Sequence, residues 1–358
     1  MRIERTTLYL LRLPLIEPYK LALGTVEAFD TVLAVIEGNG GAFGYGEATI
    51  LTGYTPETIE MSWATVGGLA EGIAGMETED ALSVLATAHL AMPFTASALA
   101  SAVEMAAGSE PLDVAEQVRV PLLAVVNAAN EAGYTREIEA SLEEGYGTLK
   151  VKVGFDAAAD MARVRSIQRL VGGRALIRLD GNQGYGLEDA VEFAGALDPD
   201  GIELLEQPCA AGDWLAAIAV AEAATVPMML DETIYGPDDI VQAAETGAAR
   251  YVKLKLMKMG SIEALENGLT RIRDLGMTPV LGNGVASDVG CWMEACVARR
   301  LIDNAGEMNG FLKPRDGVFA QAIVVDGGCA LLEPGVPALK DDNALTLLSR
   351  ERVRIEGG

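Results

Sequence analysis

The sequence predicts an α/β protein in which a barrel of parallel strands follows a smaller α+β module. From residue 120 onward, short apolar runs alternate with amphipathic helical stretches, which is typical of a parallel sheet with helical crossovers. Before that point the chain alternates polar and apolar residues and then becomes rich in alanine. Eight candidate strands favour a barrel of the (β/α)8 type, while a doubly wound sheet stays open from the pattern alone.

The N-terminal module begins with strand-like alternation. Residues 2–13 and 30–37 follow the period of two that is expected of half-buried strands. Pro14 and Pro18 interrupt the first run and predict a loop, and Gly38-Asn39-Gly40-Gly41 predicts a hairpin turn. Residues 56–108 follow as alanine-rich helices. We therefore expect an α+β capping module over residues 1–117.

The barrel is expected over residues 118–328. Amphipathic stretches such as residues 157–171 and 188–197 predict crossover helices between its strands. The remaining residues, 329–358, are rich in turns with one strand-like run at 352–355, and we expect them to pack back on the first module. The candidate barrel strands are residues 120–126, 148–154, 175–180, 202–206, 227–232, 251–256, 278–282 and 307–310.

Charge and composition argue against several classes of protein. The 358 residues carry 27 Lys+Arg against 52 Asp+Glu, a net charge of -25, which disfavours nucleic acid or an anionic membrane as a partner. The most apolar long region, residues 81–107, holds too many polar residues to span a bilayer. The first residues lack the pattern of a signal peptide. Four cysteines without CxxC spacing indicate neither a zinc site nor a disulfide framework, so we expect a cytoplasmic protein.

Two lysines stand in the second candidate barrel strand. Lys150 and Lys152 are two residues apart, so their side chains share one face of a strand. One interpretation is a surface strand with two solvated lysines. The other is a buried pair, in which repulsion and desolvation lower both pKa values and so prepare an amine for proton transfer. The residues downstream favour the second interpretation.

Three carboxylates end successive candidate strands. Asp180, Glu206 and Asp231 follow one another at intervals of about 25 residues, which is one β/α unit each. A single aspartate at a strand end is usually a helix cap. Three at one period would meet at the mouth of the barrel, where such folds carry their chemistry. They would raise one another's pKa unless a cation lay between them, and all-oxygen ligation suits Mg2+.

A second lysine pair, Lys253 and Lys255, stands four strands after the first. In an eight-stranded barrel the two pairs lie on opposite sides of the axis. A substrate carboxylate held by Mg2+ between them would have an amine on each face. Removal of the proton next to that carboxylate creates an enediolate, whose charge the metal stabilises. One lysine could therefore act as base and the other as acid.

These residues resemble the motifs of the enolase superfamily, specifically its muconate lactonizing enzyme subgroup. The resemblance covers nearly the whole chain, and it implies a modified TIM barrel of the (β/α)7β type with an N-terminal α+β capping domain. It also implies a homo-oligomer. The matching motifs are Lys150-x-Lys152, Asp180-x-Asn182, Glu206-Gln207-Pro208, Asp231-Glu232, Lys255-Leu256-Met257-Lys258 and Gly44-Tyr45-Gly46-Glu47-Ala48.

The resemblance assigns roles by position. It implies Lys152 and Lys255 as the acid/base pair, with Lys150 assisting Lys152 or touching the substrate carboxylate. Lys253 stands where the subgroup often has asparagine, so a contact with a neighbour of the metal and simple solvation both stay open. The only histidine, His89, lies in the expected cap and is interpreted as packed or solvated there. The implied Mg2+ ligands are Asp180, Glu206 and Asp231.

The resemblance also indicates where a substrate would bind. Loops of the capping domain close over the substrate in this family, which points to residues 15–26 and 49–55, with Tyr19 and Tyr54 as contacts. Candidate strands seven and eight supply Asn283, Glu307 and Asn309. Dipeptide epimerases of the subgroup have Asp-x-Asp in that region for an ammonium group, and a carboxylate beside an amide can also receive an amine. We expect a small-molecule carboxylate that bears a nitrogen, such as an amino acid derivative or a dipeptide.

The outcome of proton abstraction stays open between several reactions. Return of a proton to the opposite face gives racemisation or epimerisation, which two opposed lysines favour. Loss of a β-leaving group would make a dehydratase of a hydroxylated amino acid such as hydroxyproline, and reversal of a lactone opening would make a cycloisomerase. A metal-dependent binding or scaffold protein, which keeps the fold without catalysing a reaction, is the alternative outside the enzymes. The predicted activity is that of a Mg2+-dependent racemase or epimerase.

Overall fold

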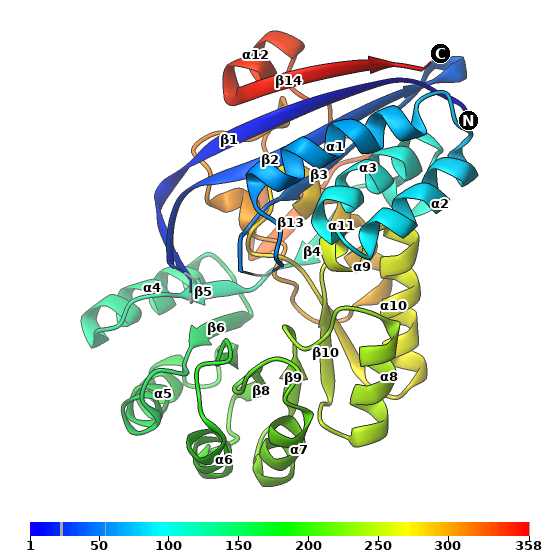
Figure 1. Ribbon diagram of the computed structural model, residues 1–358. Coiled ribbons are helices and arrows are strands. Elements are labelled where there is room, and N and C mark those ends of the chain that lie inside the picture. The colour runs from blue at the N-terminus through cyan, green and yellow to red at the C-terminus, as the bar shows by residue number, and fades with distance from the viewer. Residues whose placement is uncertain (22–23, 54, 358) are drawn as a thin grey trace.

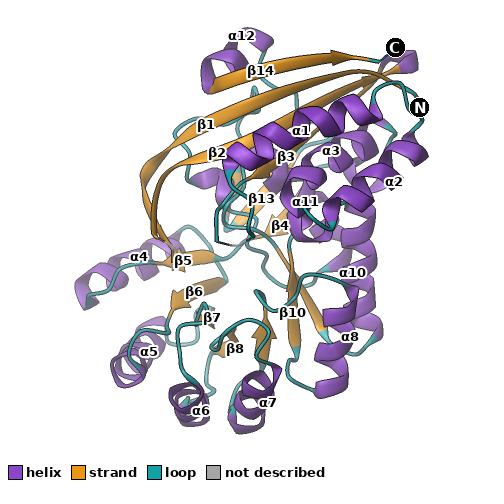
Figure 2. Cartoon of the chain, in the orientation of Figure 1, coloured by secondary structure: helices purple, strands orange, loops and turns teal. Residues whose placement is uncertain are grey.

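The computed structural model describes residues 1–21, 24–53 and 55–357 (Figure 1). An antiparallel sheet with three helices, which we call the cap, lies beside a curled parallel sheet surrounded by helices (Figure 2). The cap sheet has the strand order β14-β1-β2-β3. Its elements are β1 (Ile3–Leu21), β2 (Gly24–Gly38), β3 (Ala42–Thr49), α1 (Ile59–Ile73), α2 (Thr78–His89), α3 (Pro93–Ala106) and β14 (Ser349–Glu356).

Strand β1 is longer than predicted. The loop expected at Pro14 and Pro18 is instead a register shift between Pro14 and Tyr19, after which β1 continues opposite β2. A proline lacks the N–H that a ladder needs, so it interrupts the pairing here without ending the strand. The predicted turn is confirmed as a short 3-10 turn at Asn39–Gly41, and the predicted helical region contains α1, α2 and α3.

Two glycines in β3 let helix α3 pack closely against the cap sheet. A Cβ at Gly44 would lie 2.3 Å from the carbonyl oxygen of Ala102, and a Cβ at Gly46 would lie 2.4 Å from that of Ala98. Both distances are far below van der Waals contact, so larger residues would push the helix away. The glycines of the Gly-Tyr-Gly motif therefore have a packing role.

In the described part of the chain, seven parallel strands form the curled sheet, in the order β11-β10-β9-β8-β7-β6-β5. All the pairs in this sheet are parallel, so all carboxyl ends lie at one edge. Six predicted strands, from 148–154 to 278–282, agree with the observed bounds to within two residues. The strands are β5 (Ala124–Val126), β6 (Thr148–Lys152), β7 (Leu176–Asp180), β8 (Ile202–Glu206), β9 (Met228–Leu230), β10 (Tyr251–Leu254) and β11 (Thr278–Leu281).

Helices cover the outside of this sheet (Figure 2). The two predicted crossover helices are confirmed as α5 (Ala157–Val171) and α6 (Leu187–Ala196). Helix α5 begins where Asp156 accepts the N–H of Ala159 at 2.8 Å and ends at Gly172 in the left-handed conformation. No helix among the described residues is long and apolar enough to cross a bilayer. The others are α4 (Glu131–Glu143), α7 (Trp214–Ala223), α8 (Pro237–Thr246), α9 (Leu256–Met259), α10 (Ile262–Asp274) and α11 (Asp288–Leu301).

The eighth predicted strand, residues 307–310, is wrong. Instead of forming a ladder, this segment and Gly306 before it make one backbone hydrogen bond to β11 and two to the residues before β5. The N–H of Glu307 donates to Leu281 at 3.0 Å. On the other side the N–H of Leu123 donates to Gly306 at 2.9 Å, and the N–H of Gly306 donates to Pro121 at 2.9 Å. These bonds join β11 to the residues that lead into β5 and so close the barrel. The fold is therefore a modified α/β barrel, and the open doubly wound sheet is ruled out.

The predicted strand at 120–126 is divided between two sheets. Strand β4 (Val118–Pro121) pairs antiparallel with β13 (Cys329–Leu332), which also pairs with β12 (Val325–Asp326). The predicted strand at 352–355 lies within β14, which follows α12 (Asp342–Leu348) and pairs antiparallel with β1. The last strand of the chain therefore lies in the same sheet as the first.

Buried carboxylates hold the cap on the barrel by accepting backbone N–H groups. Glu104 of α3 accepts from Ile262 at 2.6 Å and from Glu263 at 3.0 Å, at the beginning of α10. Glu47 of β3 accepts from Ser287 at 3.0 Å, at the beginning of α11. The first N–H groups of a helix have no partner within the helix, so these side-chain oxygens satisfy them. These contacts fix the cap over the carboxyl ends of the strands.

Candidate active site

Lys150 lies at the centre of a buried ionic network inside the barrel. Its Nζ is 2.8 Å from Oδ2 of Asp180, 2.9 Å from Oε2 of Glu206 and 2.8 Å from Oε2 of Glu307. All four side chains are buried. Lys150 is on the inward face of β6, and the carboxylates come from β7, β8 and the segment that closes the barrel. The interpretation of a solvated strand face is therefore wrong for Lys150.

Lys152, at the end of β6, is the more accessible amine of the first pair. Its Nζ lies 2.5 Å from Oδ2 of Asp180, and its side chain is 26% exposed. It also donates to Oδ1 of Asn182, whose Nδ2 donates to Oε1 of Glu232 at 2.8 Å. Asp180 and Asn182 thus orient this amine from one side.

Three lysines surround Asp231 on the side of the barrel opposite Lys152. Nζ of Lys255 is 2.8 Å and Nζ of Lys258 is 3.2 Å from its Oδ1, while Nζ of Lys253 is 3.4 Å from its Oδ2. Since β10 lies four strands from β6 in the sheet, Lys152 and Lys255 approach the carboxylates from opposite sides. His89 of α2 contacts the carbonyl oxygen of Lys258 at 2.9 Å, which agrees with its interpretation as a packed residue of the cap.

Lys253 is buried and paired, so the alternative of simple solvation is wrong. Its Nζ lies 3.2 Å from Oε1 of Glu206 and contacts Oε2 of Glu307. Glu307 therefore lies between Lys150 and Lys253 and links the two sides of the barrel.

The pKa of Lys150 moves in the direction opposite to the one predicted. Burial disfavours its charged form, but the carboxylates of Asp180, Glu206 and Glu307 outweigh burial and raise the pKa well above its usual value. The prediction considered only the two neighbouring lysines. For Glu206, burial and the charge of Asp180 raise the pKa to about 7.

The three strand-end carboxylates have the donor chemistry of a Mg2+ site. Lys150 lies between Asp180 and Glu206, and Lys253 lies between Glu206 and Asp231. Oε2 of Glu206 forms no hydrogen bond, although Nζ of Lys150 is 2.9 Å away, so this buried oxygen is suited to a cation. In the described residues no three acidic, histidine or cysteine side chains surround one point. Binding of a metal requires the ammonium groups to move from between the carboxylates.

Tyr19 lies over a lysine that the sequence did not single out. Nζ of Lys313 is 4.7 Å from the centroid of the Tyr19 ring. It donates to the carbonyl oxygen of Gly284 at 2.6 Å and to Oδ1 of Asn309 at 3.4 Å. Lys313 follows a short 3-10 turn, Gly310–Leu312, and no strand ends there. Neither spacing nor periodicity marked it, and only its closeness in sequence to Asn309 could have done so.

The other predicted substrate contacts lie in the same region and are engaged by the protein itself. Oδ1 of Asn283 accepts the N–H of Val285 at 2.9 Å. Nδ2 of Asn309 donates to the main chain before β5 at 3.2 Å. Glu307 uses Oε2 for the two lysines on either side of it. Tyr54 lies outside the described residues.

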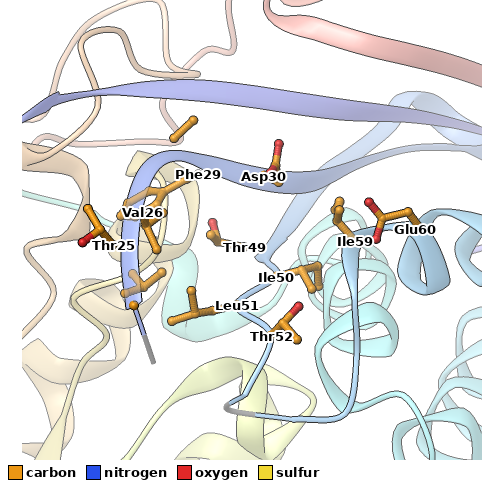
Figure 3. A pocket seen from close by; sticks show the side chains of 13 residues that line it. Thr25, Val26, Phe29, Asp30, Thr49, Ile50, Leu51, Thr52, Ile59 and Glu60 are labelled. Carbon is orange, nitrogen blue, oxygen red and sulfur yellow. The ribbon is translucent and has the colours of Figure 1, made fainter. Parts of the chain in front are cut away.

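A cavity of about 340 Å³ lies in the cap, and none of the lysines lines it (Figure 3). Its walls come from β2, β3, the residues after β3 and the beginning of α1, with Val285 from the barrel. Val26, Phe29 and Leu51 give it an apolar side, and Thr49 gives it a hydroxyl (Figure 3). Val285 lines the cavity, and the residue before it, Gly284, accepts a hydrogen bond from Lys313 through its carbonyl oxygen.

Comparison with known proteins was made for sequence and for structure. A family model described as enolase C-terminal domain-like matches residues 133–336. The L-Ala-D/L-Glu epimerase of Bacillus subtilis is 30% identical over 363 residues, which cover 95% of this chain and 96% of that protein. The similarity therefore extends through the cap as well as the barrel.

Solved structures share the fold over nearly the whole chain. The N-succinyl Arg/Lys racemase of Bacillus cereus has a TM-score of 0.89 at 22% identity, covering 99% of this chain and 100% of that one, which shows the fold alone. The dipeptide epimerase of Enterococcus faecalis, complexed with Mg and the dipeptide L-Leu-L-Tyr, has a TM-score of 0.84 at 25% identity, covering 94% and 98%. With the family model and the Bacillus subtilis relative, these findings confirm the resemblance: the chain belongs to the enolase superfamily, in its mandelate racemase/muconate lactonizing enzyme branch.

Proposed function

We propose that this protein is a Mg2+-dependent racemase or epimerase, which inverts the carbon next to the carboxylate of an amino acid derivative or a dipeptide. The observation that carries the proposal is the placement of two amines at opposite ends of one carboxylate set. Lys152 contacts Asp180 at one end, and Lys255 contacts Asp231 at the other. The epimerase of Bacillus subtilis and the dipeptide epimerase of Enterococcus faecalis support this class of activity.

The two lysines would divide the reaction between two faces of the substrate. The lysine in its neutral form takes the α-proton on its Nζ, and the lysine on the other face, as an ammonium group, donates a proton to the same carbon. One proton leaves and one arrives, so the substrate is inverted with no change in composition. For the opposite enantiomer Lys152 and Lys255 exchange roles.

Asp180, Glu206 and Asp231 would hold the Mg2+ ion. When bound, the ion supplies positive charge that stabilises the negative charge developing on the substrate carboxylate. Lys150 would keep a positive charge on the same side as Lys152, because its contact with Glu307 does not involve a metal ligand. Burial of this network excludes water, which strengthens each of these interactions.

The test uses N-acyl amino acids and dipeptides in D2O with Mg2+. We expect deuterium to enter at the α-carbon, seen by NMR, together with interconversion of enantiomers, seen by chiral chromatography. Interconversion should be lost in Lys152→Ala and in Lys255→Ala. It should persist in Lys340→Ala, which removes a lysine that pairs with Asp316 outside the site.

The same experiment separates the alternatives. Release of water or formation of a ring in the product would replace this proposal by a dehydratase or a cycloisomerase. No exchange with any of the N-acyl amino acids or dipeptides would favour a non-catalytic scaffold.

A further inference from the structure

The two strand ends that carry the proposed acid/base lysines are each held by a buried carboxylate from a helix. These carboxylates are Asp160 of α5 and Glu294 of α11, and neither belongs to the proposed Mg2+ ligands. The side chain of Asp160 is 4% exposed and that of Glu294 is 2% exposed. Burial of a carboxylate is costly unless it accepts strong hydrogen bonds, so the groups that each one binds show what it does in the fold.

Asp160 binds the chain directly after Lys152. Its Oδ2 accepts the three successive N–H groups of residues 154–156, at 3.0, 3.0 and 3.3 Å, and the hydroxyl of Tyr185 at 2.8 Å. Arg163, one turn further along α5, lies 3.2 Å from Oδ1 of Asp160 and donates to the carbonyl oxygen of Lys152. The backbone at Lys152 and after it is therefore fixed to α5.

The position of this turn also decides where Lys152 lies relative to its partners. Gly154 has a φ of 98°, and a Cβ there would lie 2.3 Å from the carbonyl oxygen of Gly181. Gly181 stands between Asp180 and Asn182, the two residues to which Nζ of Lys152 donates. A shift of the turn would therefore move the amine away from the groups that orient it.

Glu294 holds the corresponding point after Lys255. Strand β10 ends at Leu254, and Lys255 is the residue at which the chain enters the short helix α9. The N–H of Leu256 donates to Oε1 of Glu294 at 2.8 Å. The first N–H groups of a helix have no partner within the helix, so this side chain supplies one. The strand end that carries Lys255 is therefore fixed to α11.

We infer that Asp160 and Glu294 are positioning residues, each of which holds one of the two acid/base lysines and so serves one enantiomer of the substrate. This inference rests on the proposed function and adds two residues to it. The amine of a lysine stands at the end of a flexible four-carbon stem, so its place depends on where the strand ends. A displacement of about 1 Å can slow a reaction about 100-fold.

Glu137 of α4 offers a matched control. Its Oε2 accepts the N–H groups of Asn127 and Ala128 at 2.8 and 2.9 Å, directly after β5. This is the same kind of contact, made at a strand end that carries neither acid/base lysine. Loss of Glu137 should therefore loosen a strand end of the same barrel without favouring either enantiomer.

The test follows α-proton exchange of separate enantiomers of N-acyl amino acids and dipeptides in D2O with Mg2+. Asp160→Ala should slow the enantiomer that Lys152→Ala affects about 10- to 100-fold more than the other. Glu294→Ala should do the same to the enantiomer that Lys255→Ala affects, and Glu137→Ala should leave the ratio of the two rates unchanged. The double variant Lys152→Ala/Asp160→Ala should be no slower than Lys152→Ala, because Asp160 acts through that lysine.

Conservative variants separate positioning from folding. Glu294→Gln keeps an acceptor for the N–H of Leu256, so it should retain most of the exchange that Glu294→Ala loses. If Glu294→Ala does not fold, Glu294→Asp, whose carboxylate is one methylene shorter, takes its place. If Asp160→Ala does not fold, Tyr185→Phe removes a single donor from Asp160 and should slow the same enantiomer to a smaller degree.

Amide hydrogen exchange without substrate gives a readout that does not depend on activity. Asp160→Ala should speed exchange of amides 154–156 and Glu294→Ala that of Leu256, and each should leave the other strand end unchanged. Equal slowing of both enantiomers, or slowing of neither, would overturn the inference.

Failure of the proposed function has a separate signature. If the unsubstituted protein exchanges the α-proton of no compound, the proposed function is wrong, and amide exchange alone then decides on the two carboxylates. Unchanged amides in both variants would overturn the inference as well. Faster amide exchange confined to the matching strand end would leave the positioning of the two lysines standing.

Discussion

Nζ of Lys253 lies 3.2 Å from Oε1 of Glu206 and also contacts Glu307, so one lysine of β10 joins β8 to the segment that closes the barrel. An ammonium group thus lies against the middle carboxylate of the proposed metal ligands. A divalent cation at this carboxylate must displace it, and the two cations compete for the same oxygen atoms.

We therefore expect Lys253→Asn to bind Mg2+ more tightly than the unsubstituted protein. A gain of about tenfold, equal to about 1.4 kcal/mol, is the expected size for removal of one competing charge. Isothermal titration with MgCl2 measures it without any substrate. Lys340→Asn is the matched control and should leave the affinity unchanged. Weaker Mg2+ binding by Lys253→Asn would mean that Lys253 orients Glu206 for the metal and does not compete with it.

The assignment of Lys152 and Lys255 to opposite faces predicts a different effect of each substitution on the two enantiomers of the substrate. Lys152→Ala should lose α-proton exchange with one enantiomer, and Lys255→Ala should lose exchange with the other, each by at least about 100-fold, because each amine serves one face. NMR in D2O on the separate enantiomers measures this. If one variant stops exchange of both enantiomers while the other stops neither, the assignment of one lysine to each face is wrong.

Glu47 predicts a pH dependence of stability that arises at the junction of cap and barrel. Burial raises its pKa to about 8 from an ordinary value of 4.5, with the N–H of Ser287 opposing the shift. An acid with a higher pKa in the folded state binds its proton more tightly there. Its contribution to stability is therefore complete below pH 4.5 and is lost as the pH rises to 8.

Denaturant unfolding at a series of pH values measures this effect. Between pH 5 and 8 the free energy of unfolding should fall more steeply in the unsubstituted protein than in Glu47→Gln, by at most about 1.4 kcal/mol per pH unit. Glutamine keeps an acceptor for Ser287, so the variant should still fold. Equal slopes in both proteins would show that Glu47 is ionised throughout.

Gly46 predicts a cost for one added methyl group. Gly46→Ala should lower the free energy of unfolding by about 1–3 kcal/mol, because its Cβ would lie 2.4 Å from the carbonyl oxygen of Ala98 in α3. Gly67→Ala is the matched control in α1, where nothing lies within 4 Å of the added atom. That variant should be as stable as the original or slightly more so. Two variants of equal stability would mean that α3 can move away from the sheet.

Most barrel strands could be predicted because parallel strands are buried on both faces and form continuous apolar runs. The eighth could not, since Glu307 and Asn309 alternate with Met308 as residues of a strand do, yet the segment makes only an isolated bridge on one side and one backbone bond on the other. The division of residues 120–126 between two sheets could not be predicted either. The apolar run is continuous in the sequence, but the chain passes from one sheet to another after Pro121.

The gathering of Asp180, Glu206 and Asp231 could be predicted because a barrel brings successive strand ends together. The pKa of Lys150 could not, since it depends on carboxylates from three other segments rather than on its neighbour Lys152. Lys313 could not be found from a pattern either. Its position is set by a 3-10 turn and by the carbonyl oxygen of Gly284, and neither leaves a period in the sequence.

The segment that closes the barrel also carries side chains of the candidate active site. A closure held by three backbone hydrogen bonds opens at a lower free-energy cost than a full strand ladder, so local unfolding should begin there. The stretch that forms this closure carries Glu307 and Asn309, and Lys313 follows it. Local unfolding of this segment would therefore displace the candidate ligand-binding side chains as well. A ligand that binds these side chains would stabilise the closed barrel, and amide hydrogen exchange at positions far from the ligand would slow.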